Sequence, residues 1–171
     1  LFAMLDIDFP AMARIPLFQL RASLKKGRLR AVYLADERQR YGYAIYQRYA
    51  PQHLTHVLYL AALPPYRSAG LGRTLMQRLN RLAGGRILLD AEDPAYAKTA
   101  KERNTDDKRI AFYRRNGYRV LPEFKFLNVG YHMLVLANFA PPRVHWLRMY
   151  RALYNNANGL PVARFLVTPY T

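Results

Sequence analysis

The chain of 171 residues contains no cysteine. Disulfide bonds, thiolate metal ligands and a cysteine nucleophile are therefore excluded. Long apolar runs are also missing, because the uncharged stretch at 57–66 is too short to span a bilayer and contains two adjacent prolines. The beginning of the chain carries Asp6 and Asp8, which does not fit a signal peptide. These absences predict a cytoplasmic protein with no membrane partner.

Acidic residues are scarce, with 11 Asp and Glu against 27 Lys and Arg, and none follows Glu123. The resulting net charge of +16 favours anionic partners, nucleic acid among them. The basic residues are dispersed, however, and no RNA-binding aromatic signature, zinc finger or helix-turn-helix accompanies them. We therefore expect nucleic acid not to be the main ligand. A basic surface that steers a phosphorylated cofactor inward fits the pattern better.

Apolar periodicity divides the chain into alternating helices and strands, which indicates an α/β sheet with mixed pairing. The length and the hydrophobic fraction of 51% fit one compact domain over residues 1–171, with a core at about 10–137 and an extension at 138–171. The predicted elements are helix within 9–26 interrupted near Pro16, strands 30–35, 41–46 and 56–63, a helix between Gly70 and Gly84, strand 86–92, a polar loop with some helix at 95–107, a short helix at 108–115, and strands 118–126 and 130–137.

The extension has weaker signals. Pro141 and Pro142 can start a helix, which Asn155–Gly159 would end, and residues 162–168 are compatible with one more strand. Three roles remain open for this helix–strand tail: packing on the sheet, which is the default, lining a substrate pocket, or contacting a second copy in a homodimer.

A glycine-rich turn follows the apolar strand at 56–63 and leads directly into a helix. Its sequence is Arg-x-x-Gly-x-Gly, from Arg67 to Gly72. Glycines let a ligand approach the backbone closely, and a helix N-terminus adds unpaired N–H groups and a partial positive charge. The turn is therefore suited to a pyrophosphate. A Rossmann motif is excluded because no third glycine follows at the required spacing, and a P-loop because no Gly-Lys-Ser/Thr occurs.

Together with a second segment, Arg109-Ile-Ala-Phe-Tyr-Arg-Arg-Asn-Gly-Tyr118, this turn resembles the GNAT family of acetyl-CoA-dependent N-acetyltransferases. The family pattern is Arg or Gln-x-x-Gly-x-Gly or Ala, and the match is complete. The resemblance covers residues 10–137 and implies a mostly antiparallel, twisted central sheet flanked by helices. It also implies acetyl-CoA as co-substrate, no metal, and a small-molecule or peptide amine as acceptor. The cofactor-binding residues that it implies are Ala62 and Leu63 for the pantetheine arm, and Arg67, Ser68, Ala69, Gly70, Leu71, Gly72, Arg73 and Thr74 for the pyrophosphate.

Tyr113 is the candidate general acid. Acetyl transfer from a thioester releases a thiolate, and a phenol with a pKa near 10 can protonate a thiol whose pKa is near 8.5. The resemblance places this acid in Phe-Tyr-x-x-x-Gly-Tyr, and Phe112 and Tyr113 could alternatively be plain core aromatics. Many relatives carry Asn seven positions earlier, where this chain has Asp106. Asn104 is a candidate substitute for that contact, and Arg114 is a candidate for the CoA 3′-phosphate.

Glu92 is the candidate base or amine-binding group, because only about a thousandth of an alkyl ammonium is neutral at pH 7. Alternation along 86–92 puts Asp90 and Glu92 on one face of the strand. Either carboxylate could instead hold an arginine in a structural ion pair. His53 and His56 lie on different faces before a strand and lack a third ligand nearby, so we predict no metal site.

Two other function classes stay open. One is a non-catalytic acyl-CoA-binding or regulatory module with the same fold, which would bind CoA without releasing thiol. The other is a basic RNA- or ribosome-associated protein, whose binding would weaken steeply with salt.

Overall fold

Seven strands form a single sheet in the order β1-β2-β3-β4-β6-β5-β7 among the described residues. The computed structural model describes residues 1–67, 69–128, 131–140, 145–161, 163 and 167–169. Neighbouring strands are antiparallel except β3 and β4, which are parallel. The strands are β1 (Arg30–Ala35), β2 (Arg40–Tyr49), β3 (Leu54–Ala62), β4 (Ile87–Glu92), β5 (Arg119–Asn128), β6 (Tyr131–Ala137) and β7 (Thr168–Pro169).

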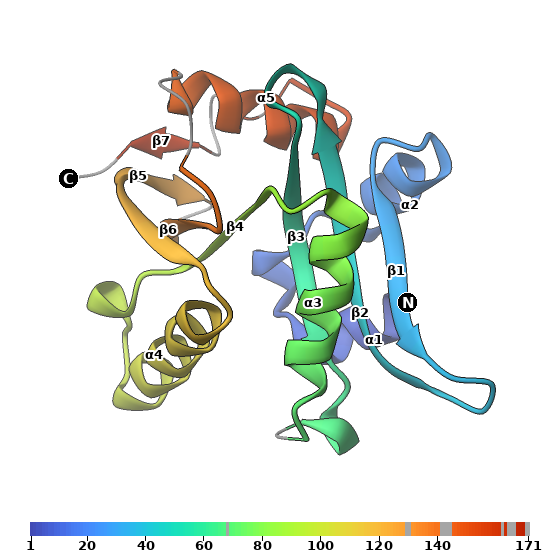
Figure 1. The fold of residues 1–171 in the computed structure, drawn as a ribbon. Helices are drawn as coiled ribbons and strands as arrows, with labels where there is room; N and C mark the ends of the chain where they lie inside the picture. The colour runs from blue at the N-terminus through green and yellow to red at the C-terminus, as the bar shows by residue number, and fades with distance from the viewer. Residues whose placement is uncertain (68, 129–130, 141–144, 162, 164–166, 170–171) are drawn as a thin grey trace.

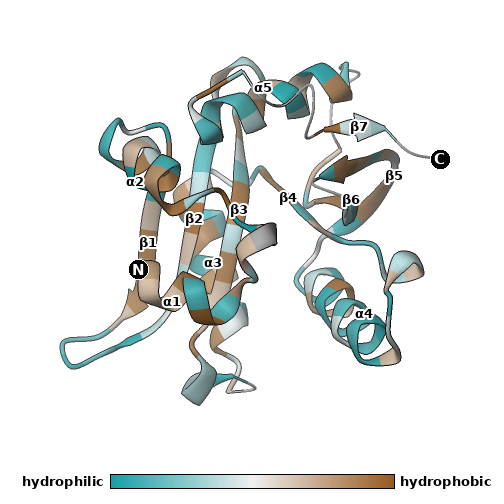
Figure 2. Cartoon of the chain, turned by 180° about the vertical axis from the view of Figure 1, so that it is seen from behind, coloured by the Kyte–Doolittle hydropathy of each residue, from teal (hydrophilic) through white to brown (hydrophobic). Residues whose placement is uncertain are grey.

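Helices cover both faces of this sheet. One face carries α3 (Leu71–Ala83) and α4 (Ala100–Arg115), and the opposite face carries α1 (Phe2–Asp8), α2 (Leu17–Lys25) and α5 (Trp146–Asn158) (Figures 1 and 2). Short 3₁₀ turns occupy Ala11–Ala13 (η1), Ala50–Gln52 (η2), Pro64–Tyr66 (η3) and Pro94–Tyr96 (η4). The predicted mixed α/β fold with a mostly antiparallel sheet is confirmed.

The alternation along β4 decides which side chains meet which helices. Ile87, Leu89 and Ala91 are buried with α3 and α4, whereas Leu88 is buried with α5. Asp90 therefore points to the α5 side of the sheet, as the period-two pattern predicted.

The predicted polar loop at 95–107 is wrong for most of its length, because α4 already begins at Ala100. Thr99 and Glu102 form a capping box: the Thr99 hydroxyl accepts from the Glu102 N–H at 3.1 Å, and the Glu102 carboxylate accepts from the Thr99 N–H at 3.2 Å. The helix is polar because most of it faces solvent, and only Asp106, Ile110 and Tyr113 are buried. The polar composition of 95–107 therefore favoured a loop, although the Thr99–Glu102 capping box indicated the start of a helix.

The two ends of the chain also differ from expectation. An unpredicted helix, α1, precedes the 3₁₀ turn η1, so only the part of 9–26 after Pro16 is α-helical. In the extension, α5 confirms the predicted helix and β7 is a two-residue strand. Pro141, Pro142 and Val162 lie outside the described residues.

The pairing between β3 and β4 ends early. Partners are Thr55 with Ile87, His56 with Leu88 and Val57 with Leu89, after which both strands continue without pairing to each other. β3 stays bound to β2 and β4 to β6, so the two strands diverge in the middle of the sheet (Figure 1). No helix in the described ranges is both long enough and apolar enough to cross a membrane.

Candidate active site

A cavity of about 480 Å³ lies where β3 and β4 diverge. Val57–Leu60 of β3 and Leu89, Asp90 and Glu92 of β4 contribute to its walls. Further walls come from the N-terminal segment, α4, β5, β6 and α5. The cavity is therefore reached by helices from both faces of the sheet. The ionisable side chains in its lining are those of Arg14, Tyr59, Asp90, Glu92, Arg109, Tyr113, Tyr131 and Tyr154, and Asn128 adds an amide.

The glycine turn adopts a backbone that requires glycine at one position. Gly70, the N-cap of α3, has φ +76°, and its carbonyl accepts from the N–H groups of Arg73 and Thr74 at 3.0 and 3.3 Å. Apart from its chain neighbours and the backbone of its own helix, no described residue has an atom within 4 Å of the place where a Cβ would lie. No side chain of the described residues caps α3, which leaves the first-turn amides of Leu71 and Gly72 for an anion. Ser68 lies outside the described residues.

Gly72 brings the turn against α4. A Cβ at this position would lie 3.2 Å from the Phe112 ring, so the absence of a side chain allows α3 to pack closely on the helix that carries Tyr113. The two segments that suggested the function in the sequence are thus neighbours in the fold.

Arg67 is fixed beside the turn by α1. Its Nη2 donates to Asp8 Oδ1 at 2.5 Å, and its Nε donates to the Ala62 carbonyl at 3.3 Å. Tyr43 donates to the second Asp8 oxygen at 2.9 Å. The Asp8 side chain is only 2% exposed, whereas that of Arg67 is 54% exposed and remains accessible to a ligand.

At the end of β3, beside the gap between β3 and β4, Ala62 and Leu63 were expected to offer backbone groups to the pantetheine arm, and this holds only in part. The Leu63 N–H donates to Tyr41 O at 2.8 Å and the Leu63 carbonyl accepts from Tyr66 at 2.9 Å, so its backbone is not available to a pantetheine arm. Antiparallel pairing alternates, and the same register turns the backbone groups of Leu60 and Ala62 away from β2 and toward the gap. Leu60 therefore replaces Leu63 as a candidate.

Tyr113 lies in the last turn of α4 and lines the cavity, with 8% of its surface exposed. No described residue is hydrogen-bonded to its hydroxyl. Burial raises the pKa of Tyr113; the positive charge of Arg109 lowers it, and the negative charge of Asp90 raises it further. The phenol is therefore protonated at neutral pH, as a general acid must be.

Glu92 and Arg109 form an ion pair inside the cavity. Arg109 Nη1 also lies 3.5 Å from Asp106 Oδ1, one turn earlier on α4. Glu92 therefore forms the ion pair with an arginine that the sequence left open as an alternative role for this carboxylate. Its role as base stays a prediction.

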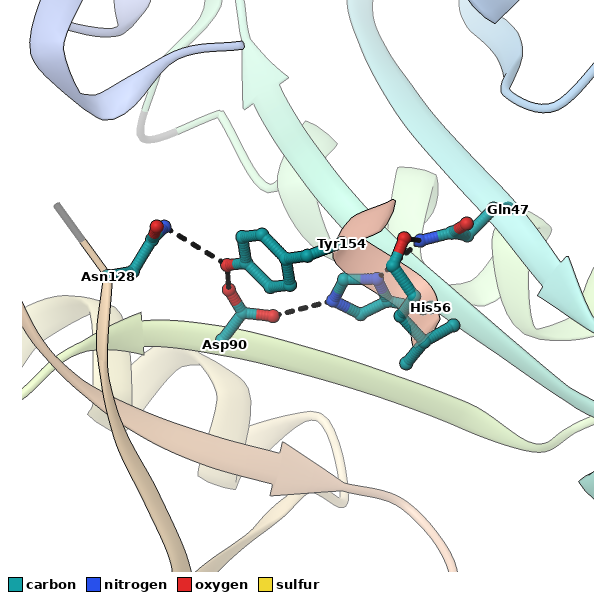
Figure 3. A network of polar contacts seen from close by, with 6 residues as sticks. Gln47, His56, Asp90, Asn128 and Tyr154 are labelled. Atoms are coloured by element: carbon teal, nitrogen blue, oxygen red, sulfur yellow. Dashed lines mark hydrogen bonds and ion pairs between the residues drawn. The ribbon is translucent and has the colours of Figure 1, made fainter. Parts of the chain in front are cut away.

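A second carboxylate, Asp90, is the centre of a polar network that the sequence did not reveal (Figure 3). His56 Nε2 lies 2.6 Å from Asp90 Oδ1, and the Tyr154 hydroxyl donates to Asp90 Oδ2 at 2.8 Å. Asn128 donates to the Tyr154 oxygen at 3.2 Å. Burial, together with the charge of Asp90, raises the pKa of Tyr154 well above its ordinary value. Within the described ranges, no group of three or more His, Cys, Asp or Glu side chains is placed to bind a metal ion.

A family model described as an acetyltransferase (GNAT) domain matches residues 28–120, just over half of the chain. The chain belongs to the GNAT acetyltransferase family. The matched range contains the glycine turn, the diverging strands and Tyr113. No curated protein sequence matches the chain.

Solved structures of GNAT proteins share the fold. An acetyltransferase of the GNAT family from Bacteroides thetaiotaomicron is 18% identical and has a TM-score of 0.77, with 93% of this chain and 90% of that chain covered. An aminoglycoside 6′-N-acetyltransferase complexed with coenzyme A is 17% identical, with a TM-score of 0.57 and coverage of 82% and 89%. A ribosomal-protein-alanine N-acetyltransferase from Brucella melitensis is 19% identical, with a TM-score of 0.52 and coverage of 72% and 76%.

Two further candidates for contacts with CoA, Asn104 and Arg114, do not line the cavity. Asn104 is exposed and, nine residues before Tyr113, lies on the opposite side of α4. Arg114 is exposed on the same helix, and no described residue forms a side-chain hydrogen bond or ion pair with it. Asp106, seven residues before Tyr113, shares the Tyr113 side and is buried. Asp106 therefore lies on the Tyr113 side of α4, at the position where many GNAT relatives carry Asn, and it places a carboxyl group there.

We expect Asp106→Asn to stabilise this GNAT protein at neutral pH but not near pH 4. Burial, then the charges of Glu102 and Asp107, raise the pKa of Asp106 to about 6, although Arg109 is close. Because the folded state binds this proton more tightly than the unfolded state, stability is lost as pH rises from about 4 to about 6. The side-chain amide of the variant does not titrate, so the variant does not lose this unfolding free energy. We expect the difference to be about 1–2 kcal/mol, because solvent screens a partly exposed carboxylate. Denaturant unfolding of the wild type and of Asp106→Asn at pH 4 and pH 7.5 measures this difference in unfolding free energy. The same difference at both pH values would contradict the prediction.

Proposed function

We propose that the chain transfers an acetyl group from acetyl-CoA to a primary amine, directly within a ternary complex and without a covalent enzyme intermediate. The observation that carries this proposal is the divergence of β3 and β4 around a cavity that reaches both Tyr113 and two carboxylates. The glycine turn follows the end of β3, and β3 also lines the cavity. In this proposal one extended ligand runs along β3, with its pyrophosphate at the turn and its thioester in the cavity. The absence of cysteine agrees with direct transfer.

In this proposal the residues around the gap hold the co-substrate. The amides of Ala69–Gly72, with Arg67, Ser68, Arg73 and Thr74, bind the pyrophosphate at the start of α3. The outward backbone groups of Leu60 and the N–H of Ala62 pair with the pantetheine arm as an added strand would, while the Ala62 carbonyl accepts from Arg67. Arg67 adds a charge that Asp8 orients but does not cover.

The chemistry is divided between the two sides of the cavity. Tyr113 donates its proton to the departing thiolate. One of the two carboxylates, Glu92 or Asp90, accepts a proton from the ammonium group of the acceptor. Both steps raise the rate only if the donor and acceptor groups lie within hydrogen-bond reach of the reacting atoms.

The acceptor is a small molecule or a peptide in this proposal. The structural relatives named above include enzymes for an aminoglycoside and for a protein alanine, so the fold accommodates both classes. We propose further that residues 1–171 act as one domain, since Tyr154 of the extension lines the same cavity as Tyr113.

Acetyl-CoA at about a hundred times its dissociation constant is expected to raise the melting temperature by about 5–10 °C. A panel of primary amines should then give thiol release with at least one member. A thermal shift without thiol release from any amine would favour the non-catalytic acyl-CoA module. Absence of any shift, combined with salt-sensitive RNA binding, would favour the nucleic-acid alternative.

A further inference from the structure

The hydrogen bonds around Gln47 fix the tautomer of His56. Gln47 Nε2 donates to the Leu153 carbonyl at 3.0 Å, and because a carbonyl can only accept, the amide orientation is determined. The same Nε2 lies 3.1 Å from His56 Nδ1, and Asn156 donates to Gln47 Oε1 at 2.6 Å. His56 Nδ1 is thus the acceptor of the second Gln47 hydrogen.

This network assigns His56 as neutral, with its single proton on Nε2. In a doubly protonated His56, the hydrogen on Nδ1 would face the N–H of Gln47, and two donors cannot form a hydrogen bond with each other. The Nε2–H donates to Asp90, and both residues are enclosed, with the His56 side chain 1% and the Asp90 side chain 10% exposed. Figure 3 shows this order from Gln47 through His56 to Asp90 and Tyr154.

Asp90 therefore receives hydrogen bonds from two neutral groups and no positive charge. Other carboxylates near the cavity differ: Asp8 is paired with Arg67, and Glu92 and Asp106 with Arg109. In the part of the chain that the structure describes, no lysine or arginine forms an ion pair with Asp90. A buried carboxylate without a cation is costly, so its presence beside a cavity indicates that a ligand supplies the cation.

We infer that Asp90 is the receptor for the ammonium group of the acceptor. This inference rests on the proposed acetyl transfer. The two arginines that line the cavity are each paired with another carboxylate, Arg14 with Asp6 and Arg109 with Glu92, so neither forms an ion pair with Asp90. Phe9, Tyr59 and Tyr131 in the walls suit an apolar or aromatic body.

The proton then moves in a balanced sequence. An N–H bond of the ammonium breaks and its proton passes to Asp90, which frees the nitrogen lone pair to bond to the acetyl carbon. The carbon–sulfur bond breaks, and Tyr113 gives its proton to the sulfur. The nitrogen, still carrying one proton too many, returns a proton to the Tyr113 oxygen, and Asp90 releases its own to solvent.

Calorimetry on the full chain saturated with CoA tests the receptor, with 2-phenylethylamine and the neutral isostere 2-phenylethanol as probes. The wild type should bind the amine at least tenfold more tightly than the alcohol. Asp90→Asn, which removes the charge and keeps one acceptor oxygen for either His56 or Tyr154, should lose this preference. Asp107→Asn, which removes an exposed charge on α4, should retain it.

Equal binding of the two probes by the wild type, or failure of the amine to bind, would overturn the inference. So would a loss of preference in Glu92→Gln but not in Asp90→Asn. Thiol release with 2-phenylethylamine should also fall at least about 100-fold in Asp90→Asn, while the thermal shift with acetyl-CoA stays. If other amines are acetylated and Asp90→Asn acetylates them normally, the inference fails and the proposed function stands. If no amine releases thiol, the proposed function itself fails.

Discussion

Replacing Tyr113 by Phe is expected to lower turnover by about 100- to 10,000-fold, with acetyl-CoA affinity changed by less than about twofold. The substitution removes one oxygen from a side chain that is 8% exposed, and no described residue is hydrogen-bonded to that oxygen. Folding therefore loses no hydrogen bond. The departing thiolate loses its proton donor, so the effect should appear in the maximal rate of thiol release.

Tyr118→Phe is the matched control. Tyr118 belongs to the same buried cluster, with its ring centroid 6.1 Å from that of Tyr113, but it does not line the cavity. Its hydroxyl donates to Asn80 at 3.0 Å, so the control should cost about 1 kcal/mol of stability and leave turnover intact. Near-normal turnover of Tyr113→Phe at every pH would remove Tyr113 from the mechanism.

The glycine turn and its helix were predictable because their signals are local. Arg67, Gly70 and Gly72 stand within a few residues of one another, and the same backbone that needs glycine at φ +76° also exposes the amides. Asn116 and Gly117 likewise marked the end of α4, which fixed the register of Tyr113. Such features depend on neighbouring residues rather than on tertiary contacts.

The start of α4 and the role of α1 were missed for different reasons. The Thr99–Glu102 box was present in the sequence, but the polar composition of 95–107 outweighed it. The helix α1 is held by contacts distant in sequence, since Asp8 pairs with Arg67 and Tyr43. No local pattern reveals that a charge near the start of the chain orients the arginine of the turn.

The Asp90 network could be predicted only in part. Strand alternation placed Asp90 on a face separate from Leu89 and Ala91, and the structure confirms it. Its partner Tyr154 is 64 residues away, on a helix whose docking the sequence left open between three roles. The tail packs on the sheet and also lines the cavity.

Gly70→Asp is expected to weaken CoA binding by at least about 100-fold. A carboxylate at the start of α3 would stand where the pyrophosphate is proposed to lie, and two like charges about 5 Å apart near a protein surface repel by about 3 kcal/mol. The described residues leave room for the side chain, since apart from chain neighbours and the backbone of α3 none has an atom within 4 Å of the place where its Cβ would lie. Calorimetric titration with CoA measures the loss. Gly72→Asp should also abolish binding, but contact with Phe112 would disturb the packing of α3 on α4 at the same time.

Gly84→Asp separates charge repulsion from backbone strain. Gly84 caps the other end of α3 with φ +71°, close to the +76° of Gly70, and it too has no atom within 4 Å of its Cβ. Both variants thus carry the same strain and the same new charge. The helix dipole favours a carboxylate at Gly70 and disfavours one at Gly84, so the control should be the less stable protein. If the less stable control binds CoA normally and Gly70→Asp does not, loss of folding cannot explain the difference. Unchanged CoA affinity in Gly70→Asp would instead show that the pyrophosphate does not bind at this turn.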